Sequence, residues 1–234
     1  MVKQESDELL TKAALEIAEK EFDTMMASGK PPMEGYDLFI KTKSKAAYQN
    51  LQEEYTSFES DMEKAVELIS ERILSLPDEK KLPLLEQLEN AAEHFDAHQN
   101  DEAFFQEIFG FSNDSMSIIY EMASHDLKSD KNTSAEVLFR FLAFLNPSVV
   151  PFWVGHGMAL VNLDKLDTAV DIFTKGTLAN PDDPLPRTQL VNLYLKMDHI
   201  PEAKHELEEL ERIALGDQYQ ELREEISQIK NTLN

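Results

Sequence analysis

The chain contains no cysteine among its 234 residues. Disulfides, thiol nucleophiles and thiolate metal sites are therefore excluded. Because a protein without disulfides suits a reducing compartment, we expect a cytoplasmic location.

Positive charge and long apolar runs are also scarce. The chain has 22 Lys and Arg against 45 Asp and Glu, a formal net charge of -23. Such a field repels phosphate backbones and anionic lipids, so we expect no nucleic-acid partner and no stable membrane insertion. The most apolar stretch, Val149 to Leu163, is short and is interrupted by Pro151, His156 and Asn162. The N-terminal MVKQESDELL has no apolar signal-peptide core, so we expect no cleaved signal.

Glycine is limited to 7 residues, and apolar residues recur at helical steps of three and four. One apolar stripe precedes Gly29-Lys30-Pro31-Pro32, which predicts a first helix that ends near Ser28. A longer seam, suited to a helical hairpin or coiled coil, follows. Pro83 fits the first turn of another helix. The first stripe consists of Leu15, Ala18, Phe22 and Met25. The seam consists of Ala47, Leu51, Tyr55, Phe58, Met62, Ala65, Ile69, Ile73 and Leu76. The apolar stripe of the helix that follows Pro83 consists of Leu85, Leu88, Ala92 and Phe95. We interpret residues 1–100 as a helical N-terminal extension and a possible dimerisation region.

The remainder of the chain repeats itself every 34 residues. The recurring positions are Ala135, Ala169 and Ala203; Phe139, Phe173 and Leu207; and Pro147 and Pro181. A 34-residue period of two helices is the tetratricopeptide signature, with a small residue where the helices touch and an aromatic residue that fills the gap. Trp153 and Gly157 occupy the aromatic and glycine positions of the middle repeat, Pro201 fits the first turn of a second helix, and Asp164 is a candidate helix cap.

The predicted fold is therefore all-α. It has three tetratricopeptide-like helix pairs, near 116–149, 150–183 and 184–217, and a closing helix at 218–233, preceded by the N-terminal extension. We assign the repeats and the closing helix to one domain at 101–234.

The order of several segments resembles the class II chaperones of type III secretion translocators, the SycD/LcrH/IpgC class. Phe152-Trp153-Val154-Gly155-His156-Gly157-Met158-Ala159 is similar to the aromatic-rich Gly-x-Gly segment of that class. Phe111-Ser112-Asn113-Asp114-Ser115-Met116 resembles the entry to its first repeat, and Asn180-Pro181-Asp182-Asp183-Pro184 the entry to its third. Tyr219 to Leu233 resembles its closing helix. The likeness covers roughly residues 104–234, and the long N-terminal extension departs from it.

The resemblance implies a non-catalytic, bacterial cytoplasmic chaperone that forms a homodimer and has secreted hydrophobic translocator proteins as its partners. It would bind an extended apolar client segment and keep the client soluble before type III secretion.

Stacked helix pairs place their first helices along a concave face. Counted from Met116, Val150 and Pro184, positions 5, 9 and 12 of each repeat should project into one groove. The predicted binding residues are Tyr120, Ser124 and Leu127; Val154, Met158 and Val161; and Thr188, Asn192 and Leu195. The alternative is that these side chains are half-exposed repeat residues that bind nothing.

Residue patterns typical of catalysis or metal binding do not occur. His94 and His98 share a helix face but lack the His-Glu-x-x-His order of zinc proteases, so we expect solvated side chains. Gly155-His156-Gly157 lacks the Gly-Lys-Ser or Gly-Lys-Thr of a phosphate loop. His156 falls within a repeat helix, where a hydrogen-bonded packing histidine is the expectation. We predict no catalytic residue, no metal and no cofactor.

Two other functions stay open at this point. The chain could be a general tetratricopeptide adaptor or scaffold in a stable complex, with its N-terminal helices as the main interface. It could also be an enzyme with an unrecognised site. A single dominant hydrophobic client captured from the native cytoplasm would favour the chaperone, and a complex of many subunits would favour the scaffold.

Overall fold

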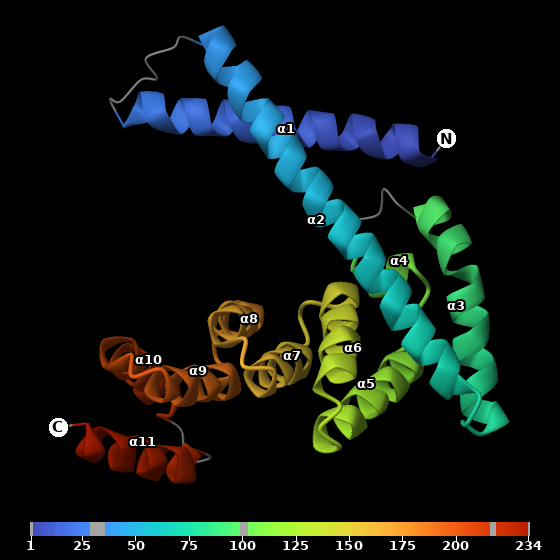
Figure 1. The fold of residues 1–234 in the computed structure, drawn as a ribbon. Coiled ribbons are helices and arrows are strands. Elements are labelled where there is room, and N and C mark those ends of the chain that lie inside the picture. Colours follow the sequence, from blue (N-terminus) through green and yellow to red (C-terminus); the bar gives the residue numbers. More distant parts are fainter. Residues whose placement is uncertain (1, 29–35, 99–102, 216–218, 234) are drawn as a thin grey trace. The chain divides into compact units, whose positions relative to one another are not determined.

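The computed structural model describes residues 2–28, 36–98, 103–215 and 219–233 (Figure 1). These residues form helices α1 to α11 and contain no strand, which confirms the predicted all-α class. The chain divides into two compact units, Met1–Glu63 and Lys64–Asn234. The division falls within one helix, α2.

The first unit holds α1 (Val2–Ala27) and the beginning of α2 (Tyr36–Ile73). The end of α1 at Ala27 confirms the predicted end of the first helix. Phe22 of α1 meets the buried Phe39 of α2 edge to face, with ring centroids 5.5 Å apart. Lys43 Nζ lies 2.5 Å from Glu21 Oε1, so an ion pair adds to this contact between the two helices.

The second unit begins with the last residues of α2, where Ala65, Ile69 and Ile73 of the predicted seam are buried. The side chains of Leu51, Tyr55 and Phe58, from the same seam, lie outside the described residues. Arg72 lies 2.5 Å from Asp126 Oδ2 and thereby ties the end of α2 to α5. Asp126 is 2% exposed, so this carboxylate needs a cationic partner.

Helix α3 (Asp78–His98) contacts α4 and α5 within the second unit. The prediction that Pro83 starts this helix is wrong, because Pro83 lies inside it. The helix begins earlier because the carbonyl of Pro77 accepts from the amides of Lys80 and Lys81 and because Asp78 and Glu79 suit a helix N-terminus. The domain boundary near residue 100 stays a prediction.

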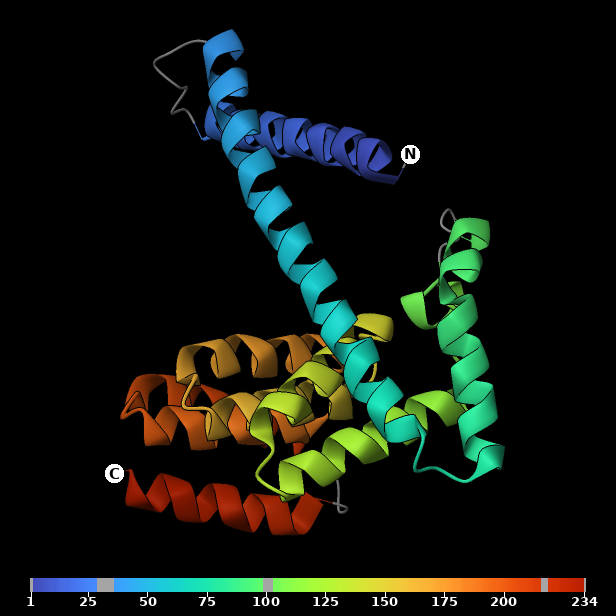
Figure 2. The same cartoon turned by 45° about the vertical axis from the view of Figure 1, so that its right-hand side comes forward.

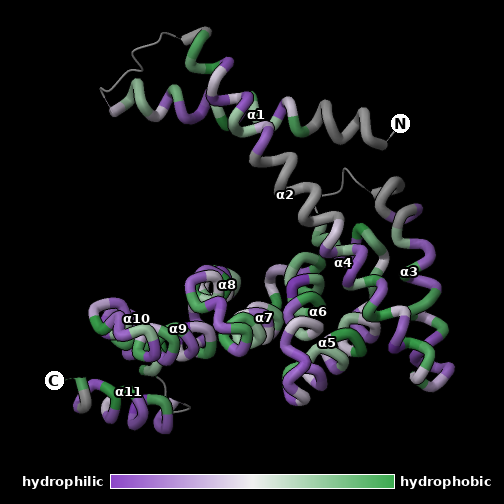
Figure 3. The backbone as a smooth tube through the Cα atoms, viewed as in Figure 1, coloured by the Kyte–Doolittle hydropathy of each residue, from purple (hydrophilic) through white to green (hydrophobic). Residues whose placement is uncertain are grey.

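Three helix pairs follow the short α4 (Phe105–Ile108) and stack one after another (Figures 1 and 2). They are α5 (Asn113–Lys128) with α6 (Asn132–Leu145), α7 (Val150–Asn162) with α8 (Leu166–Ala179), and α9 (Pro184–Lys196) with α10 (Ile200–Ile213). The closing helix α11 (Gln220–Thr232) packs on α10. The helices α6 and α7 are more apolar than α10 and α11, which are hydrophilic apart from the side that faces the core (Figure 3).

The turn inside each helix pair contains an aspartate in the left-handed conformation. Asp130, Asp164 and Asp198 have φ angles of 57°, 59° and 60° and are spaced by the repeat period. The prediction that Asp164 caps the following helix is wrong. The N-cap residue of α8 is Lys165, without a capping side-chain hydrogen bond, and Asp164 instead takes the left-handed position that ends α7, which aspartate tolerates better than most residues.

Two glycines on α7 receive phenylalanine rings from the second helices of two repeats. A Cβ atom at Gly155 would lie 2.3 Å from the ring of Phe139, and one at Gly157 would lie 2.3 Å from the ring of Phe173. Both rings are almost fully buried. The Gly-x-Gly segment is therefore required by packing, since each missing side chain leaves the space that one ring fills.

The neighbouring Trp153 is half-buried in the same junction. Its indole Nε1 donates to the carbonyl oxygen of Pro147 at 2.7 Å, which fixes the connection between α6 and α7. Trp153 also packs against the core formed by Leu160, Phe173 and Leu190.

A buried polar pair also joins α6 to α7. His156 is 4% exposed, and its Nε2 lies 3.1 Å from Glu136 Oε1. Burial lowers the pKa of His156 despite the opposing effect of Glu136, so the imidazole is neutral at neutral pH and donates Nε2–H to the carboxylate. Burial alone would raise the pKa of Glu136, but the hydrogen bond from His156 and the charge of Arg140 hold that pKa below its usual value. The expectation of a hydrogen-bonded packing histidine is thus confirmed.

Replacing Gly157 by alanine should destabilise the protein, although alanine is the better helix former by about 1 kcal/mol. The new methyl group would overlap the Phe173 ring, and overpacking of this kind costs about 1–3 kcal/mol. We expect the melting temperature to fall by about 2–8 °C, and further for Gly157→Leu. The matched control is Gly176→Ala on α8, whose Cβ would meet its nearest neighbour at 3.1 Å and should change the melting temperature less. Equal melting temperatures for wild type and Gly157→Ala would contradict the packing described here.

The His156 pair predicts a loss of stability in mild acid. The unfolded chain protonates His156 near pH 6.5 and the folded chain does so only at lower pH, so stability falls as the pH drops below about 6.5. At pH 5.5 this amounts to at most about 1.4 kcal/mol. The urea midpoint should therefore decrease less between pH 7.5 and 5.5 in His156→Gln than in the wild type. The exposed His205→Gln serves as the control and should match the wild type; a His156→Gln profile parallel to both would refute the assignment.

Candidate peptide-binding groove

The first helices of the three pairs lie next to one another, since α7 contacts both α5 and α9. Two adjoining cavities open along them. The larger, of about 740 Å³, lies mainly between α5 and α7. The smaller, of about 180 Å³, lies between α7 and α9, and Met158 and Asn162 line both. Together we call them the groove.

Seven of the nine predicted binding residues line the groove. Five line the larger cavity: Tyr120, Ser124, Leu127, Val154 and Met158. Val161 and Asn192 line the smaller one together with Met158. Their role in binding stays a prediction.

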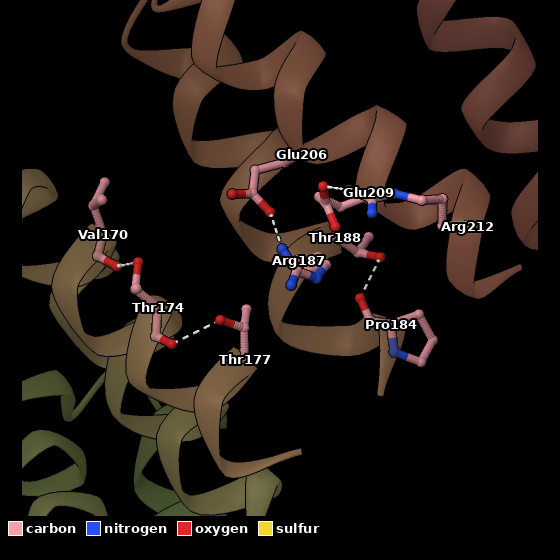
Figure 4. Close-up of polar contacts among 9 residues, drawn as sticks. All are labelled: Val170, Thr174, Thr177, Pro184, Arg187, Thr188, Glu206, Glu209 and Arg212. Carbon is pink, nitrogen blue, oxygen red and sulfur yellow. Dashed lines mark hydrogen bonds and ion pairs between the residues drawn. The ribbon is translucent and has the colours of Figure 1, made fainter. Parts of the chain in front are cut away.

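Thr188 and Leu195 line neither cavity. The Thr188 hydroxyl donates to the carbonyl oxygen of Pro184 at 3.0 Å, within its own helix (Figure 4). Leu195 packs against the cluster that contains Val191 and Leu207. In the third repeat, the side chains at positions 5 and 12 therefore do not line the groove. Thr188 is bonded to the backbone of its own helix, and Leu195 packs against the core.

Tyr120 forms part of the groove wall and is 36% exposed. Its ring meets Phe139 edge to face with centroids 5.8 Å apart, and it lies 5.9 Å from the ring of Phe152. Phe139 is in turn seated in the gap at Gly155. The packing between repeats therefore holds the aromatic wall of the groove in place.

A further cavity of about 370 Å³ lies on the other side of Tyr120, where α4, α5 and α7 meet. Gln106 lines it and is buried, and it donates to Asn113 Oδ1 at 2.7 Å and accepts from Asn146 Nδ2 at 2.8 Å. These carboxamides bond to one another and fix α4 against the first repeat.

Several groove residues were missed by the sequence analysis, which considered only positions 5, 9 and 12. They include Lys128, Asn162 and Lys196, which are all at position 13 of their repeats. The 34-residue spacing of these three polar residues was the signal that could have found them. Glu121 and Gln189, both at position 6, also line the groove.

The third repeat is held together by ion pairs away from the groove cavities. Arg187 of α9 lies 2.8 Å from Glu206 of α10, and Glu209 pairs with Arg212 on the same helix (Figure 4). Both side chains of the Arg187–Glu206 pair are largely buried, so the pair fixes how α9 sits on α10.

The described residues contain no cluster of three or more potential metal ligands. Of the two histidines considered above, His94 is exposed and lies against Gly110, and the side chain of His98 lies outside the described residues. Within the described helices, none is both long and apolar enough to cross a membrane.

No protein-family model and no curated protein sequence matches the chain. Solved structures do. The chain is 26% identical to a chain of the CopN–Scc3 complex, with a TM-score of 0.52, over 56% of this chain and 78% of that one. It is 19% identical to the type III secretion translocator chaperone SycD of Yersinia enterocolitica, with a TM-score of 0.53, over 56% of this chain and 98% of that one.

A type III secretion complex from Aeromonas hydrophila gives a TM-score of 0.54 at 16% identity, over 59% of this chain and 93% of that one. The predicted resemblance is therefore confirmed at the level of fold. Over rather more than half of its length, this chain has the fold of a type III secretion translocator chaperone.

Proposed function

We propose that this protein is a non-catalytic chaperone of the bacterial cytoplasm. It binds an extended apolar segment of a secreted translocator protein in its groove and keeps that client soluble before type III secretion. The observation that carries the proposal is the 740 Å³ cavity along the first helices, in a fold shared with the translocator chaperone SycD.

The groove residues suit an apolar client that must later be released. Tyr120 and Met158 are 36% and 40% exposed, so their apolar surface is available to a partner. Burying two or three apolar anchors gives roughly 1.5–3 kcal/mol each, and the loss of freedom on docking offsets a good part of this. We therefore expect a client peptide to bind with a Kd of about 1 μM.

The N-terminal unit supports a second proposal, that the protein forms a homodimer through its N-terminal helices. Leu15 and Met26 of α1 are 42% and 51% exposed. They are separated by three helical turns and so lie on one face. Leu38 of α2, in the same unit, is 55% exposed. Exposed apolar side chains that share one face of a helix are typical of an interface.

The groove is tested by co-expressing the full chain with a hydrophobic secreted protein encoded beside its gene. The wild type should keep that protein soluble and co-purify with it. Tyr120→Ala combined with Met158→Glu removes an aromatic wall and places a charge where an apolar anchor must lose its water, so binding should weaken at least tenfold. Circular dichroism and melting should change little, because both side chains are partly exposed.

Leu178→Glu is the matched control for this double variant. Leu178 lies on α8, is 74% exposed and lines neither groove cavity, so its replacement adds the same charge outside the groove. Client binding should be retained. A folded double variant that binds the client with wild-type affinity would exclude the groove as the client site.

The dimer is tested by light scattering on the full chain. The wild type should have twice the monomer mass of 26.7 kDa, and Leu15→Glu combined with Met26→Glu should restore the monomer mass. Ile17→Glu combined with Thr24→Glu adds the same charge at two exposed positions on the opposite face of α1, so this control should remain dimeric. A wild type of monomer mass, or a double variant of unchanged mass, would refute this interface.

A further inference from the structure

One edge of the groove carries a row of polar side chains at equivalent positions of the three repeats. Lys128, Asn162 and Lys196 are the last residues of α5, α7 and α9 and are spaced by 34 residues. Lys128 lines the larger cavity, Lys196 the smaller one, and Asn162 both. Since stacked repeats place equivalent residues along one line, the two ammonium groups flank a carboxamide along the groove.

The residues that line the groove include few carboxylates, although the protein is strongly acidic. The chain has 45 Asp and Glu, yet among the described residues that line the two cavities Glu121 is the one carboxylate. Glu121 Oε2 lies 3.5 Å from Lys80 Nζ, so its charge is offset by a lysine on α3. The described residues that line the groove therefore include no carboxylate without a cationic partner.

The two groove lysines keep their positive charge available to a partner. In the described part of the chain, neither Lys128 nor Lys196 has a carboxylate within ion-pair distance, whereas Lys43, Arg72 and Arg187 each have one. Both lysines lie in the last turn of a helix, where the helix dipole favours a cation. Asn162, between them, is held in place by its hydrogen bond to Asn132 Oδ1 at 2.9 Å.

We propose that the row Lys128, Asn162 and Lys196 recognises negative charge on the bound segment. This inference rests on the proposed groove function and specifies its client. The bound segment has carboxylates next to the apolar side chains that enter the two cavities. A neutral apolar segment would leave both ammonium groups without a partner, and a basic one would be repelled by them at short range.

The local lysines must act against the field of the whole protein, which has a net charge of -23. At physiological salt, charges more than about 8 Å apart are largely screened, so the nearest ammonium groups decide the preference inside the groove. An exposed ion pair of this kind strengthens binding by about 1.4- to 5-fold. A segment that pairs with both lysines should therefore be preferred by at least about twofold.

A pair of fluorescent probes tests this without a known client. 8-Anilinonaphthalene-1-sulfonate and N-phenyl-1-naphthylamine have the same aromatic rings, and only the first carries a negative charge. Both would be titrated into the full chain at 0.15 M salt. Because the sulfonate has one charge and pairs with one lysine at a time, Lys128→Gln combined with Lys196→Gln should weaken its binding by about 1.4- to 5-fold. The binding of the neutral probe should not change. The control is Lys165→Gln combined with Lys175→Gln, which changes the net charge equally at two α8 positions outside the groove cavities.

The two proposals can fail separately. Met158→Glu should weaken both probes, because it changes the shared wall of the two cavities. If it weakens both and the groove lysine variant does not weaken the sulfonate more than the control does, the charge preference is overturned and the groove function stands. If Met158→Glu affects neither probe, the groove takes no apolar ligand and both proposals are overturned.

A pair of peptides then tests the stated client directly. Both have the same leucine spacing, and glutamates flank the leucines in one and lysines in the other. The glutamate peptide should displace the neutral probe from the wild type at a lower concentration and should lose this advantage in the groove lysine variant. Equal displacement by the two peptides, or stronger displacement by the lysine peptide, overturns the proposal.

Discussion

The insertion of phenylalanine rings into the gaps at Gly155 and Gly157 is the contact on which the repeat region depends. Each ring comes from the second helix of a different pair, so α7 is joined to the repeat before it by Phe139 and to its own partner helix by Phe173. Any side chain at either glycine would place its Cβ atom 2.3 Å from a ring carbon, well below the van der Waals contact distance. Tyr120 of α5 contacts Phe139 of α6 and Phe152 of α7, and these rings form the groove wall.

Ion pairs and hydrogen bonds between buried side chains add to this packing. Three pairs of buried or largely buried polar side chains join neighbouring helices: His156 with Glu136, Arg72 with Asp126 and Arg187 with Glu206. Such pairs contribute little net stability but make any other register of the helices costly, because a shifted helix would leave a charge buried and alone. Of the many carboxylates of the chain, only Glu121 is among the described residues that line the groove cavities, together with apolar side chains, neutral polar side chains and two lysines.

Much of the repeat region could be predicted from the sequence because its period is long and its marker residues are distinctive. Ala135, Ala169 and Ala203 set the frame, and the helix pairs follow it. Local chemistry was harder to predict. Aspartate is a residue type that often caps helices, which is why Asp164 was predicted to do so. The tight turn instead needs a residue with a left-handed backbone at that position, and only the backbone geometry shows this. Thr188 and Leu195 were placed in the groove by counting alone, which cannot register that α9 turns them toward its own backbone and the core.

Trp153 has a practical consequence for following the folding of this protein. It is the single tryptophan of the chain, and its indole is hydrogen-bonded to Pro147 in the connection between the first and second repeats. Intrinsic tryptophan fluorescence therefore reports on that one junction, while far-ultraviolet circular dichroism averages over every helix. In a repeat array, where neighbouring units can in principle unfold separately, agreement of the two signals would indicate one cooperative transition, and their separation would indicate that the centre and the ends of the array melt independently.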